Sequence, residues 1–123
     1  MSLSERAQAI KKQMSGVVTL RREWEAMREE WRQMARSEEC WGEEFIWQLL
    51  LEKRALQREL AKAGLRNMAR LQRSGLNERR RQLLYMRYVQ GRSWADIVQT
   101  LGKSKQYVLR EHNRALEQVV KRA

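Results

Sequence analysis

Four polar side chains recur at helical spacing near the C-terminal end of the chain: Gln106, Arg110, Asn113 and Arg114. Residues three, four or seven positions apart share one face of an α-helix, so these side chains should point the same way. An arginine can bond bidentately to guanine, and a glutamine or asparagine to adenine, at the major-groove edges of base pairs. The pattern therefore predicts that Gln106, Arg110 and Asn113 read base edges of double-stranded DNA.

Hydroxyl and basic side chains around these three residues suit contact with a phosphate backbone. Free N–H groups at the start of a helix bind phosphate, and lysine and arginine attract it electrostatically. A helix over about 104–121 would lie in the major groove with its N-terminal part on the DNA. The predicted backbone contacts are Arg92, Lys103, Ser104, Lys105, Tyr107 and Arg114.

Catalysis and metal binding have little support in this sequence. His112 is the only histidine and falls on the apolar face of the same predicted helix, where a buried structural role is expected. Cys40 is the only cysteine and lies far from it, so no metal-ligand set can be assembled. There is no nucleophile elbow and no phosphate-binding glycine loop. We therefore expect no enzymatic activity, no cofactor and no metal.

The charge distribution favours a polyanionic partner. The 123 residues include 26 lysines and arginines and 15 aspartates and glutamates, a formal net charge of +11. Residues 1–65 hold 12 basic and 11 acidic side chains, whereas residues 66–123 hold 14 and 4. The second half should therefore carry the contact with nucleic acid. There is no apolar run of 18 residues and no secretory signal, so we expect a cytoplasmic protein without a membrane partner.

The elements that would position these side chains are three helices within residues 76–123. They are predicted over about 77–90, 94–101 and 104–121. A short helix, a glycine turn and a longer basic helix together make the helix-turn-helix arrangement. Polar N-caps and left-handed glycines separate the three helices. In chain order these residues are Asn77, Gly91, Ser93, Gly102 and Ser104.

Residues 1–65 carry the apolar pattern of two long paired helices. Between residues 10 and 34, seven of eight heptad seam positions are apolar, and Gln13 is the exception. Ser37 is a suitable start for a second helix, whose stretch 45–51 is apolar nearly all round. We therefore predict an all-α fold, in which an N-terminal long helical hairpin, coiled-coil-like, is followed by a C-terminal helix-turn-helix domain.

The predicted domains are a hairpin for oligomerisation or partner binding at 1–65, a basic linker at 66–75 and the helix-turn-helix domain at 76–123. Gly64 marks the first boundary, because glycine can end a helix in the left-handed conformation. A lone hairpin covers its aromatic side chains poorly, so we expect a second copy to complete a four-helix bundle as a homodimer. The alternative is that the C-terminal domain folds back onto this face. The predicted interface residues are Trp24, Met27, Trp31, Phe45 and Trp47.

Several strings in the C-terminal segment agree with one known pattern: LLYMRY at 83–88, GRSWADIV at 91–98, LG at 101–102 and VLREHNRAL at 108–116. Together they resemble region four of the sigma-70 class of sigma factors, which reads the promoter −35 element. They are more similar still to small phage and prophage proteins grouped with late-gene transcription regulators of the ArpU and RinA type. His112 in the last string is typical of that group. The resemblance covers about residues 76–120.

The resemblance implies a sequence-specific regulator of phage or prophage transcription that binds double-stranded DNA in a bacterial host cell. It does not imply a complete sigma factor, because the chain is too short for the regions that open the −10 element and bind core polymerase. Two alternatives stay open. The basic domain could dock on RNA polymerase as an adaptor, or the chain could be a DNA-recognition subunit of phage packaging machinery.

Overall fold

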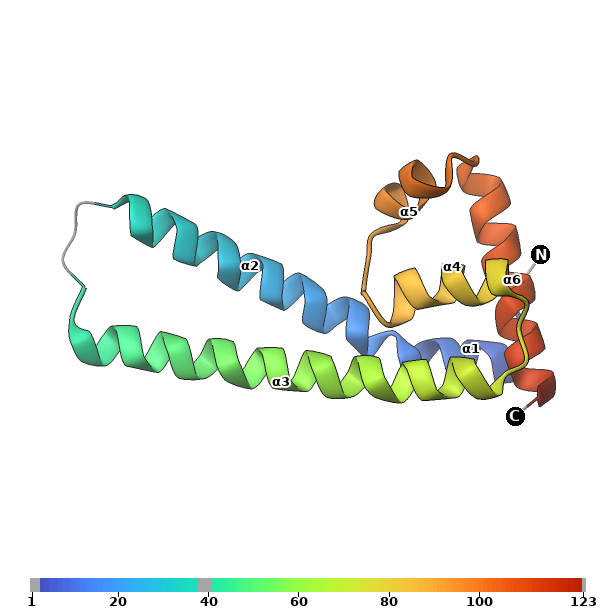
Figure 1. Cartoon of the computed structure of the whole chain (residues 1–123), viewed down its shortest axis with the longest axis horizontal. Helices are drawn as coiled ribbons and strands as arrows, with labels where there is room; N and C mark the ends of the chain where they lie inside the picture. Colours follow the sequence, from blue (N-terminus) through green and yellow to red (C-terminus); the bar gives the residue numbers. More distant parts are fainter. Residues whose placement is uncertain (1–2, 38–40, 123) are drawn as a thin grey trace.

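The computed structural model describes residues 3–37 and 41–122, and these residues form six α-helices and no strand. The prediction of an all-α fold is confirmed. α2 and α3 make a long antiparallel hairpin, and the other four helices gather around its open end (Figure 1). In chain order the helices are α1 (Glu5–Met14), α2 (Gly16–Arg36), α3 (Glu43–Arg73), α4 (Glu78–Tyr88), α5 (Trp94–Leu101) and α6 (Lys105–Arg122).

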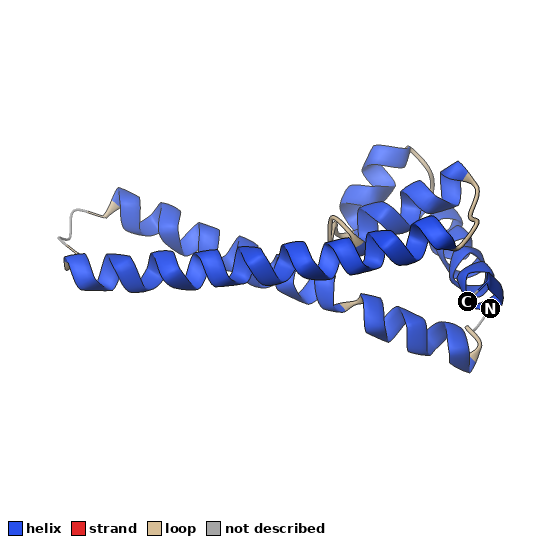
Figure 2. Cartoon of the chain, turned by 60° about the horizontal axis from the view of Figure 1, so that its bottom comes forward, coloured by secondary structure: helices blue, strands red, loops and turns tan. Residues whose placement is uncertain are grey.

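The described chain has a compact end and a projecting end, which Figures 1 and 2 show from two sides. We call the projecting part of the hairpin, residues 19–37 and 41–62, the arm. The head is every other described residue. All of the buried apolar side chains among the described residues belong to the head. Removal of apolar surface from water therefore stabilises this end of the molecule.

Polar residues cap the helices of the head. Ser4, Asn77 and Ser93 each accept the backbone N–H of the third residue that follows, at 3.2, 2.9 and 3.2 Å. Gly91 and Gly102 adopt φ angles of +69° and +65°, which glycine reaches without a steric cost. The predicted caps at Asn77 and Ser93 and the two predicted glycine turns are confirmed.

Two clusters of buried apolar side chains hold the head together. The larger one joins α1, α3, α4 and α6 and comprises Ala7, Met14, Leu71, Leu76, Leu84, Tyr88, Ala115, Leu116 and Val119. The smaller one joins α4, α5 and α6 and comprises Leu83, Met86, Ile97 and Val108. Because α4 contributes to both clusters, it connects the N-terminal helices to the helix-turn-helix.

A buried asparagine ties three helices together. Asn67 of α3 donates through Nδ2 to the carbonyl oxygen of Met14 at 3.0 Å and to that of Tyr88 at 2.7 Å. These carbonyls lie at the C-terminal ends of α1 and α4, where backbone oxygens have no partner within their own helix. An unpaired buried carbonyl is costly, so Asn67 fixes both helix ends against α3.

The N-terminal half differs from the prediction in two helix boundaries. The seam over 10–34 predicts one continuous helix, but Ser15 separates α1 from α2 and lets α1 turn onto α6. The predicted helix start at Ser37 is also wrong, because the N–H of Ser37 bonds to the last turn of α2. The next helix begins only at Glu43. Cys40 lies outside the described residues.

The basic linker predicted at 66–75 is wrong as well, since α3 is helical as far as Arg73. Gly64 stands inside this helix and does not end it. A Cβ atom at Gly64 would lie 3.2 Å from the backbone oxygen of Val89, so glycine permits the close approach of α3 to the end of α4. The chain turns only after Arg73, where Gly75 has a φ of +69°.

Candidate nucleic-acid interface

α5 and α6 are joined by a tight turn. The N–H of Gly102 bonds to the carbonyl of Val98 at 3.0 Å, and the left-handed glycine then reverses the chain. Ser104 Oγ accepts the N–H of Tyr107 at 3.1 Å and caps α6, as predicted. The predicted recognition helix at 104–121 therefore corresponds to α6 within one residue at each end.

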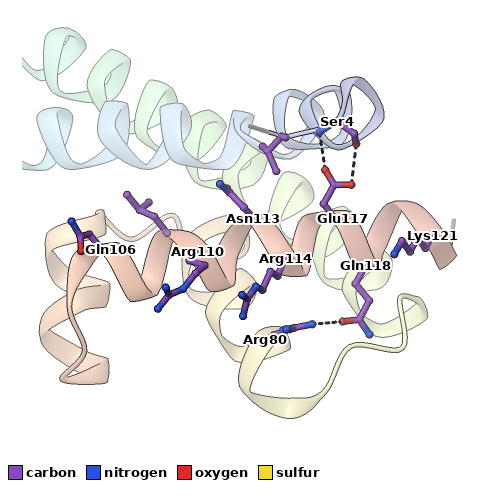
Figure 3. A pocket seen from close by; sticks show the side chains of 11 residues that line it. Ser4, Arg80, Gln106, Arg110, Asn113, Arg114, Glu117, Gln118 and Lys121 are labelled. Carbon is purple, nitrogen blue, oxygen red and sulfur yellow. Dashed lines mark hydrogen bonds between the residues drawn. The ribbon is translucent and has the colours of Figure 1, made fainter. Parts of the chain in front are cut away.

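α6 has a buried face and an open face. The five residues predicted on the core side, Val108, His112, Ala115, Leu116 and Val119, are each at most 2% exposed, which confirms that prediction. The opposite face lines an open groove of about 1140 Å³, which α4 and the start of α1 border (Figure 3). Polar groups on this open face can reach a ligand without any change in the core.

All three predicted base-reading residues line this groove. Gln106 and Arg110 are exposed and Asn113 is half-buried. Gln106 forms no side-chain hydrogen bond with any residue that the structure describes, so both ends of its amide are free. The Arg110 guanidinium lies 6.0 Å from the ring centroid of Tyr107, a distance that leaves its donors available.

Most of the predicted phosphate contacts gather at the N-terminal end of α6. Lys103 and Lys105 are exposed there, and Lys103 Nζ lies 5.7 Å from the ring centroid of Tyr107. Tyr107 Oη accepts a hydrogen bond from Arg79 Nη1 at 3.0 Å. Arg79 of α4 thus adds a further cation to this end. Together with the cap at Ser104, these groups make a basic rim beside the three residues predicted to read bases.

The other two predicted phosphate contacts already have partners within the chain. Arg92 Nε lies 2.6 Å from Asp96 Oδ2, a hydrogen bond that lowers the pKa of Asp96 and raises the pKa of Arg92. The Arg92 guanidinium also bonds to Thr100. Arg114 Nη1 lies 3.4 Å from Glu111 Oε1. Exposed ion pairs of this kind are weak, so either arginine can be shared with a phosphate.

Two polar contacts that border the groove have no signal in the local sequence. Arg80 donates to Glu111 Oε2 at 3.2 Å and to Gln118 Oε1 at 2.9 Å. Ser4 donates its N–H and its hydroxyl to the two carboxylate oxygens of Glu117, at 2.8 and 3.0 Å (Figure 3). The nearest of these partners are 31 residues apart, so helical periodicity could not pair them. The contacts hold α4 and α1 alongside α6.

His112 is buried in the core, as predicted, with 1% of its surface exposed. Its Nε2 lies 2.7 Å from the Tyr88 hydroxyl and its Nδ1 lies 2.9 Å from Asn113 Oδ1. Burial lowers the pKa of His112 to about 4 and raises the pKa of Tyr88 to about 12. Both side chains are therefore neutral at neutral pH.

The predicted interface residues of the arm fall into two groups. Trp24, Met27 and Trp31 are half-buried on α2, which packs along α3. Phe45 and Trp47 are 46% and 54% exposed. The C-terminal helices lie at the opposite end of the hairpin from Phe45 and Trp47 (Figure 1), so the alternative that they fold back onto the aromatic face is wrong for these two residues. It holds in part at Trp24, which lines a pocket together with Tyr85 and Val89.

Comparison with known proteins bears on the C-terminal part alone. Residues 74–121 match the family Sigma-70, region 4. Comparisons with curated proteins and with solved structures gave no match. The matched segment is a sigma-70 region 4-like helix-turn-helix, a DNA-binding regulatory class of domain and not an enzyme family. None of the described helices is long and apolar enough to cross a membrane.

Proposed function

We propose that the chain is a sequence-specific regulator of phage or prophage transcription, of the ArpU and RinA type, that binds double-stranded DNA in the cytoplasm of a bacterial host cell. The open face of α6 carries this proposal. Gln106, Arg110 and Asn113 present base-reading groups there, within a domain of the sigma-70 region 4 type. The excess of basic side chains in residues 66–123 adds electrostatic attraction to the phosphates.

In this proposal, α6 enters the major groove and its outer face meets the base edges. Arg110 pairs with guanine, and each good bidentate pair discriminates against a wrong base by about 1–3 kcal/mol. In the same proposal, residues on both sides of the open face of α6 contact the phosphate backbone of the DNA. The residues proposed for them are Arg92, Lys103, Ser104, Lys105, Tyr107 and Arg114, with Arg79 added by the structure.

We propose that the arm pairs with the arm of a second copy. Trp41 stacks on Phe45 with ring centroids 5.3 Å apart, and Trp47 and Leu51 lie one turn apart on α3. All four side chains are between 37% and 56% exposed, and exposed large apolar side chains that cluster in this way mark sites of protein interaction. Residues 19–62 hold 9 basic and 10 acidic side chains, so two arms can approach without net repulsion. A dimer would place two reading heads on half-sites one or more helical turns apart.

Two arginine variants test the reading mode. We expect Arg110→Ala to relax the base preference at one position of the binding site, because only a base contact is lost. We expect Arg114→Ala to weaken binding to all sequences alike and to reduce the slope of log affinity against log salt by about 1. Fluorescence anisotropy on duplexes with single base changes, at several salt concentrations, measures both. An unchanged base preference and affinity in Arg110→Ala would contradict the docking of α6.

A matched pair of arm variants tests dimerisation. We expect Trp47→Ser to shift the protein from dimer to monomer in sedimentation velocity, because it removes an exposed apolar ring. Gln48→Ser, at the neighbouring exposed position, should leave the dimer intact. A wild-type protein that sediments as a monomer would contradict the pairing of arms, and a closed ring of many copies would favour a packaging subunit instead.

RNA polymerase is a second candidate partner, because domains of the Sigma-70, region 4 family interact with this enzyme as well as with DNA. If the chain is an adaptor, purified RNA polymerase should retain it in a pull-down, and its contact with DNA should be weak, without salt-sensitive DNA binding. A regulator that reads DNA itself should show sequence preference in the absence of polymerase.

A further inference from the structure

The amide of Asn113, unlike the other predicted base-reading groups on the open face of α6, is held by a buried network of hydrogen bonds. Asn113 Oδ1 lies 2.9 Å from His112 Nδ1, and His112 Nε2 lies 2.7 Å from the Tyr88 hydroxyl. His112 and Tyr88 are both at most 1% exposed. The three side chains Tyr88, His112 and Asn113 therefore form a hydrogen-bond network that extends from the core of the head to the open groove.

The positions of the hydrogens in this network follow from the groups that form it. A carbonyl oxygen can only accept, so His112 Nδ1 carries the hydrogen that bonds to Asn113 Oδ1. In a neutral imidazole the other nitrogen is then an acceptor, and the Tyr88 hydroxyl donates to it. The ring cannot turn freely, because Trp94 packs against it edge to face with ring centroids 4.8 Å apart.

The amide of Asn113 is thereby oriented with its oxygen toward His112 and its NH2 group toward the groove. Figure 3 shows this side chain leaving α6 with nitrogen at its outer end. An asparagine that reads adenine uses both ends of its amide, since adenine presents the N7 acceptor beside the N6 donor. Asn113 offers only the donor end.

We propose that the pair Tyr88 and His112 makes Asn113 a donor-only reader, which selects a keto base, guanine or thymine, and rejects adenine. The inference rests on the proposed DNA-reading function of α6. Guanine presents O6 and N7 as acceptors and thymine presents O4, so the NH2 group finds a partner on either base. Adenine also offers an acceptor, N7, but a bond from the NH2 group to N7 places the N6 donor of adenine beside an amide whose oxygen is turned away toward His112, so the second bond of the usual asparagine–adenine pair is lost.

Gln106 provides the internal contrast. It lies on the same face of α6, it is exposed, and no residue among those described holds its amide. Gln106 can therefore turn either end toward a base and can form the bidentate pair with adenine. Of the two amides predicted to read bases on this face, only Asn113 has its choice of base restricted by the core. His112 acts through Asn113 and is a positioning residue.

The test is in vitro selection of random duplex DNA with four full-length proteins: wild type, Asn113→Ala, His112→Phe and the control Gln106→Ala. Asn113→Ala should lose the preference at one position of the motif, and that position should be guanine or thymine in the wild-type selection. We expect at least about a fivefold wild-type preference over adenine there. His112→Phe should admit adenine at this position and leave the rest of the motif unchanged. Gln106→Ala should alter a different position.

Each other outcome overturns a definite part of the account. Adenine at the position that depends on Asn113 would refute the donor-only orientation and leave DNA reading by α6 intact. If Asn113→Ala selects the same motif as the wild type, Asn113 does not read a base; the inference is then refuted, and DNA reading by the rest of α6 is left intact. The comparison of the wild type with Asn113→Ala still tests the inference if His112→Phe fails to fold, because it does not use a substitution in the core. A wild-type selection without any motif would overturn the proposed function and this inference together.

Discussion

The head and the arm share the hairpin of α2 and α3, but they differ in how far their apolar side chains are buried. In the head, Met14, Leu84 and Leu116 are completely buried, and several helices share each cluster. In the arm, no described residue is buried, and Trp47 and Leu51 remain more than half exposed. The head thus has a buried core within one chain, whereas the arm leaves large apolar side chains exposed.

The same contrast appears in the charges. Acidic and basic side chains nearly cancel in the arm, but residues 66–123, most of which lie in the head, hold 14 basic and 4 acidic side chains. A nearly neutral apolar surface suits a protein partner, and a strongly basic surface suits DNA. We therefore propose that the head binds DNA and that the arm binds protein, and the following substitutions test that division.

The largest effect is expected from matched leucine substitutions at the two ends. Leu116→Ala removes a completely buried side chain and should lower the free energy of unfolding by about 2–5 kcal/mol. Leu51→Ala, at a position that is 56% exposed, should lower it by less than about 0.5 kcal/mol in dilute solution. Urea unfolding followed by circular dichroism measures both. Equal losses would show that the arm has a core of its own.

The buried histidine predicts a pH dependence that belongs to the head. Burial lowers the pKa of His112 to about 4, whereas the unfolded chain should titrate near 6.5, so the unfolded state binds more protons between these values. The contribution of His112 to the free energy of unfolding is therefore fully present above about pH 6.5. It is lost as the pH falls toward 4, by about 3 kcal/mol in total.

The measurement compares wild type with His112→Phe in urea unfolding at pH 7.5 and pH 4.5. The variant should lose less stability on acidification, because its ring has no proton to gain. Parallel losses in the two proteins would show that His112 is not the group responsible.

A smaller effect is expected at the buried amide that joins α1 and α4 to α3. Asn67→Leu leaves the carbonyls of Met14 and Tyr88 without their donor, and the free energy of unfolding should fall by about 1–3 kcal/mol. Gln72→Leu, at an exposed position of the same helix, is the matched control and should have little effect. If both variants are equally stable, the head does not depend on this connection.

The smallest effect is expected at the start of α1. Ser4→Ala removes the cap of α1 and the hydroxyl bond to Glu117, which should cost about 1 kcal/mol. Hydrogen exchange should show faster exchange in α1 than in the wild type, while α5 stays protected. Thr19→Ala, at an exposed site in α2, is the control. Unchanged protection of α1 would mean that its apolar contacts alone hold it on α6.

The parts of the fold that follow from local chemistry could be predicted from the sequence. Caps such as Ser93 and turn glycines such as Gly102 act over three or four residues, and the face of α6 that contains Val108 follows from one helical period. The same local logic placed Gln106, Arg110 and Asn113 on one open face.

The features that could not be predicted from the sequence depend on contacts between segments far apart in the chain. Gly64 is of a residue type that often ends helices, yet it lies inside α3, where the lack of a side chain permits the close approach to Val89. The docking of α1 on α6, with Ser4 on Glu117, joins residues 113 positions apart. The tie between Asn113 and His112 needs the side-chain geometry of both residues, because adjacent positions on a helix do not face one another.

The most direct test of the central claim is a competition between two duplexes of equal length at physiological salt, one recovered by in vitro selection with the wild-type protein and one of random sequence. A protein that reads bases through α6 should bind the selected duplex at least about a thousandfold more tightly, with the motif in two spaced inverted half-sites if the arm pairs two copies. Equal affinity for the two duplexes would contradict the account, because it would leave only the electrostatic attraction that any basic surface has for DNA.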